Sequence, residues 1–276
     1  MFRLGWFSTG RGPGSRDLLR AVMEEKEHGS LDVDVAFVFC NWDNLEDPNP
    51  RREQREMFFD MVRGYGIPLI TSSWKGFHPD LWKSDQAAWR DEYGKLLRDL
   101  TRGYEFDLGV LAGYMLWMDD ATCDEYDMIN LHPALPDGPK GTWEEVIWEL
   151  IRTDAKEHGV MLHICTRDWD RGGALAYCRF PIRGGEFDAL WSDMKEKLSS
   201  STLEGIKEKE GADEPLFREI RREGVRRELP LTVSTIRLFA EGTIHIEGKS
   251  LTVNGRTLER PYDMTDKVDD TLRCGI

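Results

Sequence analysis

The sequence lacks an excess of positive charge and any hydrophobic run long enough to cross a membrane. Lys and Arg total 37 against 51 Asp and Glu, which gives a formal net charge of −14. Nucleic-acid binding normally depends on neutralising phosphates, so this balance argues against an extended nucleic-acid surface. The longest apolar run, Leu108–Met118, is far shorter than the ~20 residues that a transmembrane helix needs. We therefore expect no membrane partner.

The sequence is also poor in patterns that indicate disulfides, metals or secretion. Its cysteines are odd in number, widely spaced and form no C-x-x-C motif; they are Cys40, Cys123, Cys165, Cys178 and Cys274. This usage predicts reduced thiols in a cytoplasmic protein and no metal site. Residues Met1–Ser8 lack a basic region followed by a long apolar stretch, so we expect no signal peptide. The expected partners are small-molecule substrates, and a homodimer stays open.

Short apolar runs alternate with helical patterns over about residues 1–155. The chain has 276 residues, 40% of them apolar, which is enough to build a core. The pattern predicts strands at Leu4–Ser8, Val33–Cys40, Ile67–Thr71, Leu108–Ala112 and Met128–Leu131. Strand–helix alternation of this kind predicts an α/β fold with a Rossmann-like, doubly wound and mainly parallel sheet.

The composition changes after about residue 183. Before that point, Val160–Cys165 and Leu175–Phe180 predict two further strands joined by a turn. Residues 192–228 are dense in Lys, Arg and Glu and predict solvated helices, and a helix over Leu231–Ala240 and a hairpin around Glu247–Ser250 follow. We therefore expect a catalytic domain over residues 1–183. Residues 184–276 would form a helical and hairpin C-terminal extension packed on the same domain.

A glycine-rich segment, Gly10–Arg16, follows the first expected strand. Ligands of open α/β sheets bind beyond the carboxyl ends of the strands. Glycines allow close backbone approach, and a helix N-terminus presents N–H groups to an anion. The segment matches neither the P-loop pattern nor a clean G-x-G-x-x-G. An anion site and an ordinary turn capped by Ser15 are therefore both open.

Asn130 and His132 close the fifth expected strand, and they share a face if its side chains alternate. Asn donates a neutral hydrogen bond, and His donates or shuttles a proton near neutral pH. A structural His-Pro turn is the alternative. The loop Thr166–Gly173 carries Asp168 and Asp170, which fit either a site or a solvated turn. His163 lies inside an expected strand and is interpreted as a core or supporting histidine.

Several motifs together resemble those of the folate-dependent formyltransferase family. They run in the family's order over about residues 3–182 and, more weakly, over 219–246. The glycine-rich turn ends in Gly-Ser, like the family's phosphate loop. The other matching segments are Asp107-Leu-Gly-Val-Leu-Ala-Gly-Tyr-Met115, Asn130-Leu-His-Pro-Ala-Leu-Pro136, Glu157-His-Gly-Val-Met-Leu-His163 and Asp170-Arg-Gly-Gly173.

The resemblance implies a formyl transferase that uses 10-formyltetrahydrofolate as donor and needs no metal. It implies a catalytic trio of Asn130, His132 and Asp170. It also implies donor contacts at one upstream arginine, at the end of the fourth strand with its following loop, and in the later acidic loop. These residues are Arg90, Leu111, Gly113, Tyr114, Met115, Met118, Thr166 and Asp168. The acceptor would meet the glycine-rich turn at Gly12, Gly14, Ser15 and Arg16.

The departures from the family pattern gather on the acceptor side. Arg16 stands where the family usually has Asn, and the late helix offers Glu223 or Glu228 only after a shift in register. The resemblance favours 5′-phosphoribosylglycinamide as acceptor, as in purine biosynthesis. An amino-sugar nucleotide or methionyl-tRNA stays open as acceptor. So do a non-catalytic sensor that binds folate or nucleotide, and an unrelated α/β domain.

Overall fold

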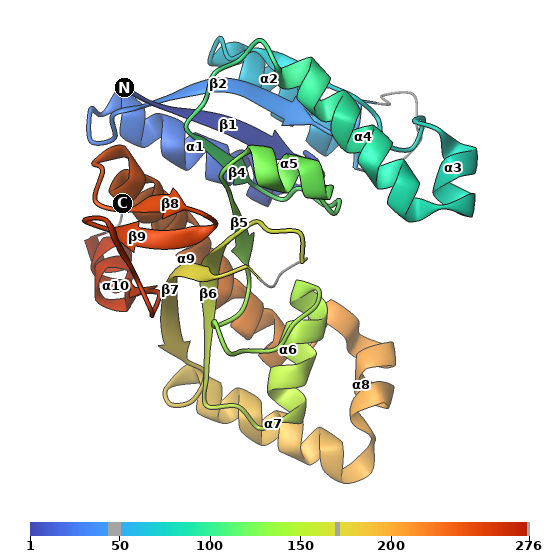
Figure 1. The fold of residues 1–276 in the computed structure, drawn as a ribbon. Helices are drawn as coiled ribbons and strands as arrows, with labels where there is room; N and C mark the ends of the chain where they lie inside the picture. The colour runs from blue at the N-terminus through green and yellow to red at the C-terminus, as the bar shows by residue number, and fades with distance from the viewer. Residues whose placement is uncertain (44–50, 169–171, 275–276) are drawn as a thin grey trace. The chain divides into compact units, whose positions relative to one another are not determined.

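A computed structural model describes residues 1–43, 51–168 and 172–274 (Figure 1). Contacts within the chain group it into two compact units, each assembled from three segments. The first comprises residues 1–131, 163–173 and 233–259; the second comprises residues 132–162, 174–232 and 260–276. This grouping does not test the expected boundary between residues 183 and 184, which stays a prediction.

The first unit is built on parallel strands, as the sequence pattern predicts. Strand β1 (Phe2–Ser8) pairs in parallel with β2 (Val33–Cys40) and with β4 (Leu108–Leu111). Strand β3 (Leu69–Thr71) pairs with β2, and β5 (Met128–His132) pairs with β4, again in parallel. The order β5-β4-β1-β2-β3 brings the carboxyl ends of these strands to one edge. This edge is where ligands of such sheets bind.

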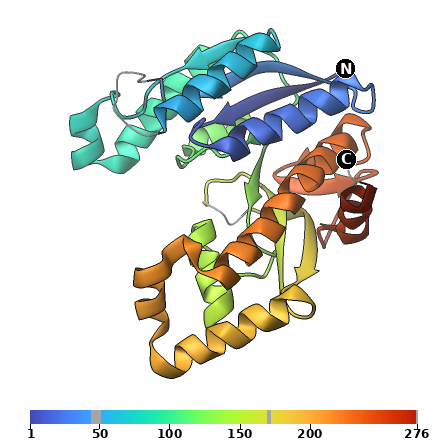
Figure 2. The same cartoon turned by 180° about the vertical axis from the view of Figure 1, so that it is seen from behind.

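Helices cover both faces of this sheet, so the fold is doubly wound. Helices α1 (Pro13–Glu27) and α2 (Arg52–Gly64) lie together on one face, which Figure 2 shows toward the viewer. Helices α4 (Gln86–Thr101) and α5 (Asp120–Glu125) lie on the other, in front of the strands in Figure 1. The short α3 (Pro79–Ser84) packs on α4. The expected α/β class is therefore confirmed.

The core of the first unit is rich in aromatic rings. Phe7, Phe37 and Phe39 from β1 and β2 are fully buried and meet Trp89 and Tyr93 of α4. The Trp89 and Tyr93 rings stack at 5.0 Å between centroids. Burying such rings removes large apolar areas from water, which stabilises the face of the sheet that lies beneath α4.

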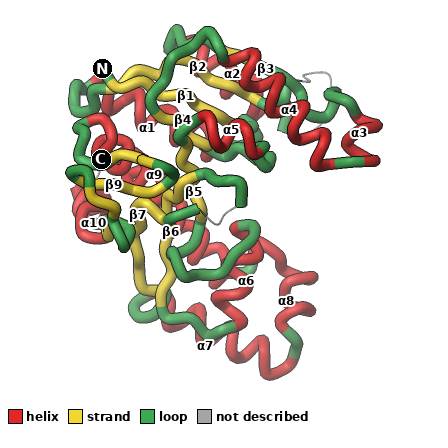
Figure 3. The backbone as a smooth tube through the Cα atoms, in the orientation of Figure 1, coloured by secondary structure: helices red, strands yellow, loops and turns green. Residues whose placement is uncertain are grey.

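The second unit contains most of β6 (Glu157–Ile164) together with β7 (Ala174–Pro181) and β11 (Tyr262–Asp263), which pairs with β7 in parallel. Its helices include α6 (Trp143–Arg152), α7 (Glu186–Ser200) and α8 (Leu203–Glu210), shown in red in Figure 3. A capping box fixes the start of α6, since Thr142 accepts from the Glu145 N–H and Glu145 accepts from the Thr142 N–H. Buried residues of α6, α7, α8 and α9 (Pro215–Ala240) contribute to one apolar core.

The late chain differs from expectation in two places. The expected helix over Leu231–Ala240 is wrong as a separate element, because α9 (Pro215–Ala240) runs on through Pro230. A proline removes one backbone donor without always ending a helix. Helix α10 (Thr265–Cys274) was not expected.

The expected hairpin is confirmed as β8 (His245–Glu247) and β9 (Ser250–Val253), with β10 (Arg256–Thr257) beside it. Its turn uses two residues with positive φ, Gly248 (56°) and Lys249 (61°), as a tight hairpin requires. The Lys249 ammonium donates to the Tyr126 carbonyl at 2.8 Å, which anchors the turn just before β5. No helix among residues 1–43, 51–168 and 172–274 is both long and apolar enough to span a membrane.

Candidate functional site

The first unit contains a pocket just beyond the ends of β4 and β6 and beside β5. Its open volume is about 330 Å³, including space open to solvent. The lining residues are Leu111, Tyr114, Leu116, Trp117, Met118, Asn130, His163, Cys165 and Thr166. The wall is apolar with a few polar groups, which suits a flat heteroaromatic ligand.

Two polar side chains of this wall, Asn130 and His163, contact each other. The Asn130 Nδ2 atom lies 3.2 Å from His163 Nε2, and His163 Nδ1 lies 3.1 Å from the Ile164 carbonyl oxygen. A carbonyl only accepts, so Nδ1 of His163 carries the proton. In the neutral ring Nε2 then accepts from the Asn130 amide. This arrangement assigns the orientation of the Asn130 side chain, with its nitrogen toward His163.

The apolar part of the wall comes from the segment after β4. Tyr114 and Met118 are buried, whereas the Trp117 side chain is 40% exposed. Burial raises the pKa of Tyr114 above its usual range, so its phenol stays protonated. The Arg90 guanidinium of α4 lies 4.1 Å from the centre of the Trp117 ring. This contact places the expected donor-binding arginine beside the pocket wall.

The glycine-rich turn lies directly against the same segment. The Thr9 N–H donates to the Gly113 carbonyl at 3.1 Å, and the Met115 N–H donates to Thr9 Oγ1 at 2.9 Å. Gly113 has a φ of +68°, and a Cβ added there would lie 3.0 Å from the Ser15 hydroxyl. A side chain at residue 113 would therefore strain the backbone and crowd Ser15. The expected acceptor and donor segments are neighbours within one unit.

Helix α1 begins earlier than expected and leaves its N-terminus without a side-chain cap. Its N-cap is Gly12 and Pro13 takes the first position, so Ser15 lies inside the helix and does not cap it. A Cβ added at Gly12 or Gly14 would meet nothing within 4 Å. Packing within the described chain therefore does not explain these two glycines, and the N–H groups beside them are suited to an anion.

Arg16 does not extend from this helix end into open solvent. Its side chain is buried, with the residue 8% exposed, and Nη1 donates to the Gln54 carbonyl at 3.0 Å. This contact ties α1 to α2. The expected role of Arg16 as an anion clamp stays a prediction, and it would have to coexist with or replace the bond to Gln54.

His132, the other polar residue of β5, lies near His158 of the second unit. His132 and His158 of β6 are both buried. Burial, the positive charge of Arg221 and the nearby His132 lower the pKa of His158 to about 3, so this ring is neutral at physiological pH. A Cβ at Gly224 of α9 would lie 3.8 Å from His158 Nε2. The same helix face carries Arg221 and Glu228, paired at 2.6 Å.

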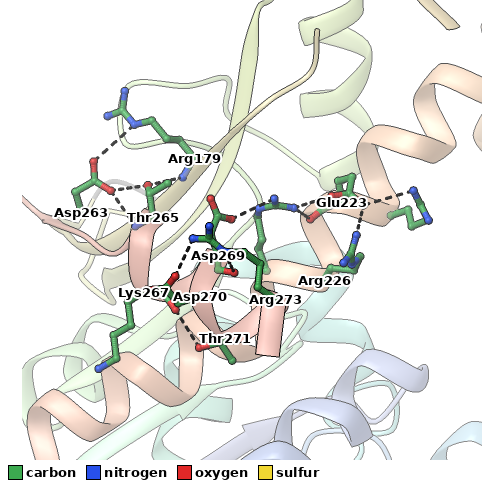
Figure 4. A network of polar contacts seen from close by, with 12 residues as sticks. Arg179, Glu223, Arg226, Asp263, Thr265, Lys267, Asp269, Asp270, Thr271 and Arg273 are labelled. Carbon is green, nitrogen blue, oxygen red and sulfur yellow. Dashed lines mark hydrogen bonds and ion pairs between the residues drawn. The ribbon is translucent and has the colours of Figure 1, made fainter. Parts of the chain in front are cut away.

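Glu223 and Glu228, the acidic candidates of the late helix, are both held by arginines. Burial would raise the pKa of Glu223, but hydrogen bonds from Arg227 and Arg226 hold it below its usual value. Figure 4 shows this network, which continues from Arg227 to Asp269 of α10. Nearby, Asp263 accepts from the Thr265 N–H and pairs with Arg179. These contacts fix α10 and β11 to β7 and α9.

The structure gathers only part of the expected site. Leu111, Tyr114, Met118, Asn130 and Thr166 line one pocket. Met115 and Asp168 are exposed and not among the lining residues, and Thr166 donates to the Asp168 carbonyl at 3.2 Å. Asp170 lies outside the described residues, so the joint arrangement of the catalytic trio stays a prediction. In the described part of the chain, no three His, Cys, Asp or Glu side chains gather as a metal site.

Sequence reasoning missed the direct contribution of His163 and Cys165 to the pocket. Both line it, and His163 contacts Asn130. The signal was present in the strand pattern, because residues two apart at the end of β6 lie on the same side of the chain. The apolar neighbours of His163 favoured a core position instead.

Comparison with known proteins places these features in a family. The family described as formyl transferase matches residues 12–200, more than half of the chain. A phosphoribosylglycinamide formyltransferase from Dictyostelium discoideum is 30% identical over 129 residues, which cover 43% of this chain and 63% of the relative. The match thus spans less than two thirds of that relative.

Solved structures agree in fold. The phosphoribosylglycinamide formyltransferase of Coxiella burnetii has a TM-score of 0.66 at 18% identity, covering 95% of this chain and 99% of its own. The glycinamide ribonucleotide transformylase 1 of Symbiobacterium toebii has a TM-score of 0.61 at 20% identity, covering 92% of this chain and 94% of its own. A formyltetrahydrofolate deformylase from Pseudomonas syringae pv. tomato has a TM-score of 0.58 at 17% identity, covering 91% of this chain and 65% of its own. The match over residues 12–200 establishes that this chain belongs to the formyl transferase family.

Proposed function

We propose that the protein transfers a formyl group from 10-formyltetrahydrofolate to the amine of 5′-phosphoribosylglycinamide. The observation that carries the proposal is the pocket of the first unit, with Asn130 oriented by His163 in an otherwise apolar wall. The family match supports formyl transfer, and the Dictyostelium relative's name supports this acceptor.

The donor's pteridine ring would lie against Leu111, Tyr114 and Met118. These side chains are buried and present apolar surface, while backbone groups of the surrounding loops recognise the ring's polar edge. Trp117 and Arg90, stacked at 4.1 Å, would lie toward the rest of the folate. The guanidinium would attract the negatively charged tail of the donor.

In the proposed reaction, the acceptor amine attacks the formyl carbon and negative charge develops on the formyl oxygen. The Asn130 amide nitrogen carries two hydrogens, one directed to His163 Nε2 and the other assigned to this oxygen. His132 would donate a second hydrogen bond. Preorganised donors of this kind contribute about 2.7–4 kcal/mol each. Asp170 would accept the amine proton, directly or through water, and no covalent enzyme intermediate is required.

The acceptor's phosphate would bind at the start of α1. Gly12 and Gly14 leave space there, the helix N-terminus has no side-chain cap, and the Ser15 hydroxyl lies next to Gly113. Backbone N–H groups and the helix dipole favour a phosphate at such a position. Since Gly113 belongs to the donor segment, a phosphate at this helix end would hold the acceptor close to the donor.

A different acceptor amine is the second candidate, and the occupied charged groups favour it. Arg16 is bonded to Gln54, Glu223 to Arg226 and Arg227, and Glu228 to Arg221. The expected contacts to phosphate and ribose would have to displace these partners. An acceptor that is recognised without these three side chains would leave the partners in place.

The test is to incubate the purified protein with 10-formyltetrahydrofolate and one acceptor at a time. The acceptors are 5′-phosphoribosylglycinamide, amino-sugar nucleotides and methionyl-tRNA, with water alone as a further arm. Tetrahydrofolate release and the mass of the formylated product are measured together. Formylation of 5′-phosphoribosylglycinamide alone supports the proposal. Release of formate with water alone would instead indicate hydrolysis of the donor, and product from another amine would correct the acceptor.

A further inference from the structure

Two cysteines of the first unit come together beside the pocket. Cys123 lies on α5 and Cys165 just after β6, and their sulfur atoms are 3.8 Å apart. Cys123 is fully buried, whereas Cys165 is partly exposed and lines the pocket. A disulfide has a sulfur–sulfur distance of about 2.05 Å, so the two atoms would need to approach by about 1.8 Å.

The segments that carry these cysteines are already held together by neighbouring contacts. The Arg167 guanidinium donates to both carboxylate oxygens of Asp124, the residue next to Cys123. The Cys165 N–H donates to the Met128 carbonyl of β5 at 2.8 Å. A bond between the sulfurs would therefore add a covalent link beside an existing ion pair, without bringing distant segments together.

The other cysteines are poorly suited to oxidation or lack a partner of this kind. Burial raises the pKa of the Cys40 and Cys178 thiols to about 12, so both stay protonated and unreactive at physiological pH. Cys274 is exposed on α10. In the described part of the chain, no other pair of cysteine sulfurs is in contact. Oxidation that forms a bond within the chain would therefore be selective for Cys123 and Cys165.

We propose that Cys123 and Cys165 are a redox modification site whose reversible disulfide changes the shape of the pocket wall. The oxidant is a peroxide small enough to enter the pocket. The Cys165 thiolate attacks one peroxide oxygen and becomes a sulfenic acid, with water as the other product when hydrogen peroxide reacts. The Cys123 thiolate then attacks the Cys165 sulfur, the sulfur–sulfur bond forms and a second water leaves. In balance, two thiols and one hydrogen peroxide give one disulfide and two waters.

The bond would act on the pocket because Cys165 lies between two other lining residues. His163 contacts Asn130, and Thr166 follows Cys165 directly. Movement of Cys165 toward α5 displaces both, and with them the Asn130 amide. We expect folate affinity to fall about fivefold or more, at the lower end of typical coupling between two sites.

The experiment uses the Cys274→Ser protein, which removes the exposed thiol. It is treated with limiting hydrogen peroxide, quenched with catalase and exchanged into fresh buffer. Tryptic peptides are mapped by mass without reduction, and 5-formyltetrahydrofolate binding is measured by calorimetry before and after oxidation. Hydrogen exchange over residues 111–118 and 163–168 reports the wall without any ligand. Cys123→Ala in the same background is the matched control, since it keeps Cys165 and removes its partner.

The expected result is a linked peptide containing Cys123 and Cys165, changed exchange in both wall segments and weaker folate binding. Dithiothreitol should restore all three, and the Cys123→Ala protein should show none of them. Absence of the linked peptide, with Cys165 unreacted or oxidised beyond sulfenic acid, overturns the site. A linked peptide with unchanged exchange overturns its action on the pocket. If the reduced protein binds no folate, the proposed donor is wrong, while the peptide and exchange results still decide this inference.

Discussion

The two units surround their buried polar groups in different ways. Around the pocket of the first unit, the hydrogen-bonded pair Asn130 and His163 lies in a wall of aromatic and sulfur-containing side chains. In the second unit, His158 is buried beside Arg221, which pairs with Glu228 on the same helix face. A few hydrogen-bonding groups in an apolar wall suit a flat ring. Ion pairs on a helix suit a charged, hydroxylated ligand or serve stability alone.

This difference follows the family pattern of the sequence. The segments that form the pocket keep the family's motifs, whereas the late helix matches them only after a shift in register. The pocket segments of the first unit thus carry the family-like part of the proposal, and the late helix of the second unit carries what is particular to this chain. Each prediction below tests one side of that contrast.

The largest effect is expected at His132 and Asp170. His132→Ala removes a proposed donor to the formyl oxygen, and Asp170→Asn removes the proposed proton acceptor. We expect kcat to fall by ~10²–10⁴-fold in each variant. Rate measurements at saturating donor and acceptor check this, with circular dichroism and Tm as controls for folding. Near-normal turnover in both would remove these residues from the mechanism.

A smaller loss, with a specific pattern, is expected for the Asn130–His163 pair. Asn130→Ala should lower kcat by ~10²–10³-fold because it removes a preorganised donor. His163→Ala leaves the amide but loses its orientation, so the loss should be smaller. Because His163 acts through Asn130, the double variant should be no slower than Asn130→Ala, with a coupling energy of about 0.5–3 kcal/mol. Simple addition of the two losses would show that His163 acts independently.

The second unit should make the protein sensitive to acid through His158. Its pKa of about 3 in the folded state lies below the ~6.5 of an unfolded chain, so the unfolded state binds more protons between these values. The stability associated with neutral His158 is fully present above pH 6.5 and is lost as the pH falls. From pH 7.5 to pH 5 this loss amounts to about 2 kcal/mol.

Urea unfolding at these two pH values measures the effect. The His158→Gln protein should lose about 2 kcal/mol less than the parent between pH 7.5 and pH 5. His245→Gln, at an exposed histidine of β8, controls for the removal of a histidine. Equal pH dependence in the parent and His158→Gln would show that His158 is not buried as a neutral group.

The sequence was sufficient for the parallel sheet, and it singled out several residues that line the pocket. Val33–Cys40 was predicted with the bounds that the structure shows, because a strand covered on both faces is nearly all apolar. The segment Asp107–Met115 was recognised by its resemblance to the family's motif, and its residues Leu111 and Tyr114 line the pocket. Both features are local, so a single sequence displays them.

Other features depend on contacts between distant residues, and local patterns did not reveal them. Arg16 was expected to contact an anion. Its hydrogen bond to the Gln54 carbonyl of α2 depends instead on how two helices pack. The proximity of Cys123 and Cys165 depends on α5 meeting the end of β6, although the cysteines were expected as unrelated thiols. The expected separate helix over Leu231–Ala240 implied a boundary before Leu231 that α9 does not have. Packing decides each of these cases.

The smallest effect is expected at Arg90, and its size separates two roles. If Arg90 acts only by stacking on Trp117, a contact of about 0.5–1 kcal/mol, Arg90→Gln should raise the KM for the donor about two- to fivefold with kcat unchanged. If it also pairs with the folate tail, the rise should be larger and should shrink in high salt. A donor lacking the glutamate tail resolves the two. With that donor, the ratio of the two KM values should fall to about two- to fivefold if Arg90 also pairs with the tail, and the original ratio should persist if Arg90 only supports the Trp117 ring.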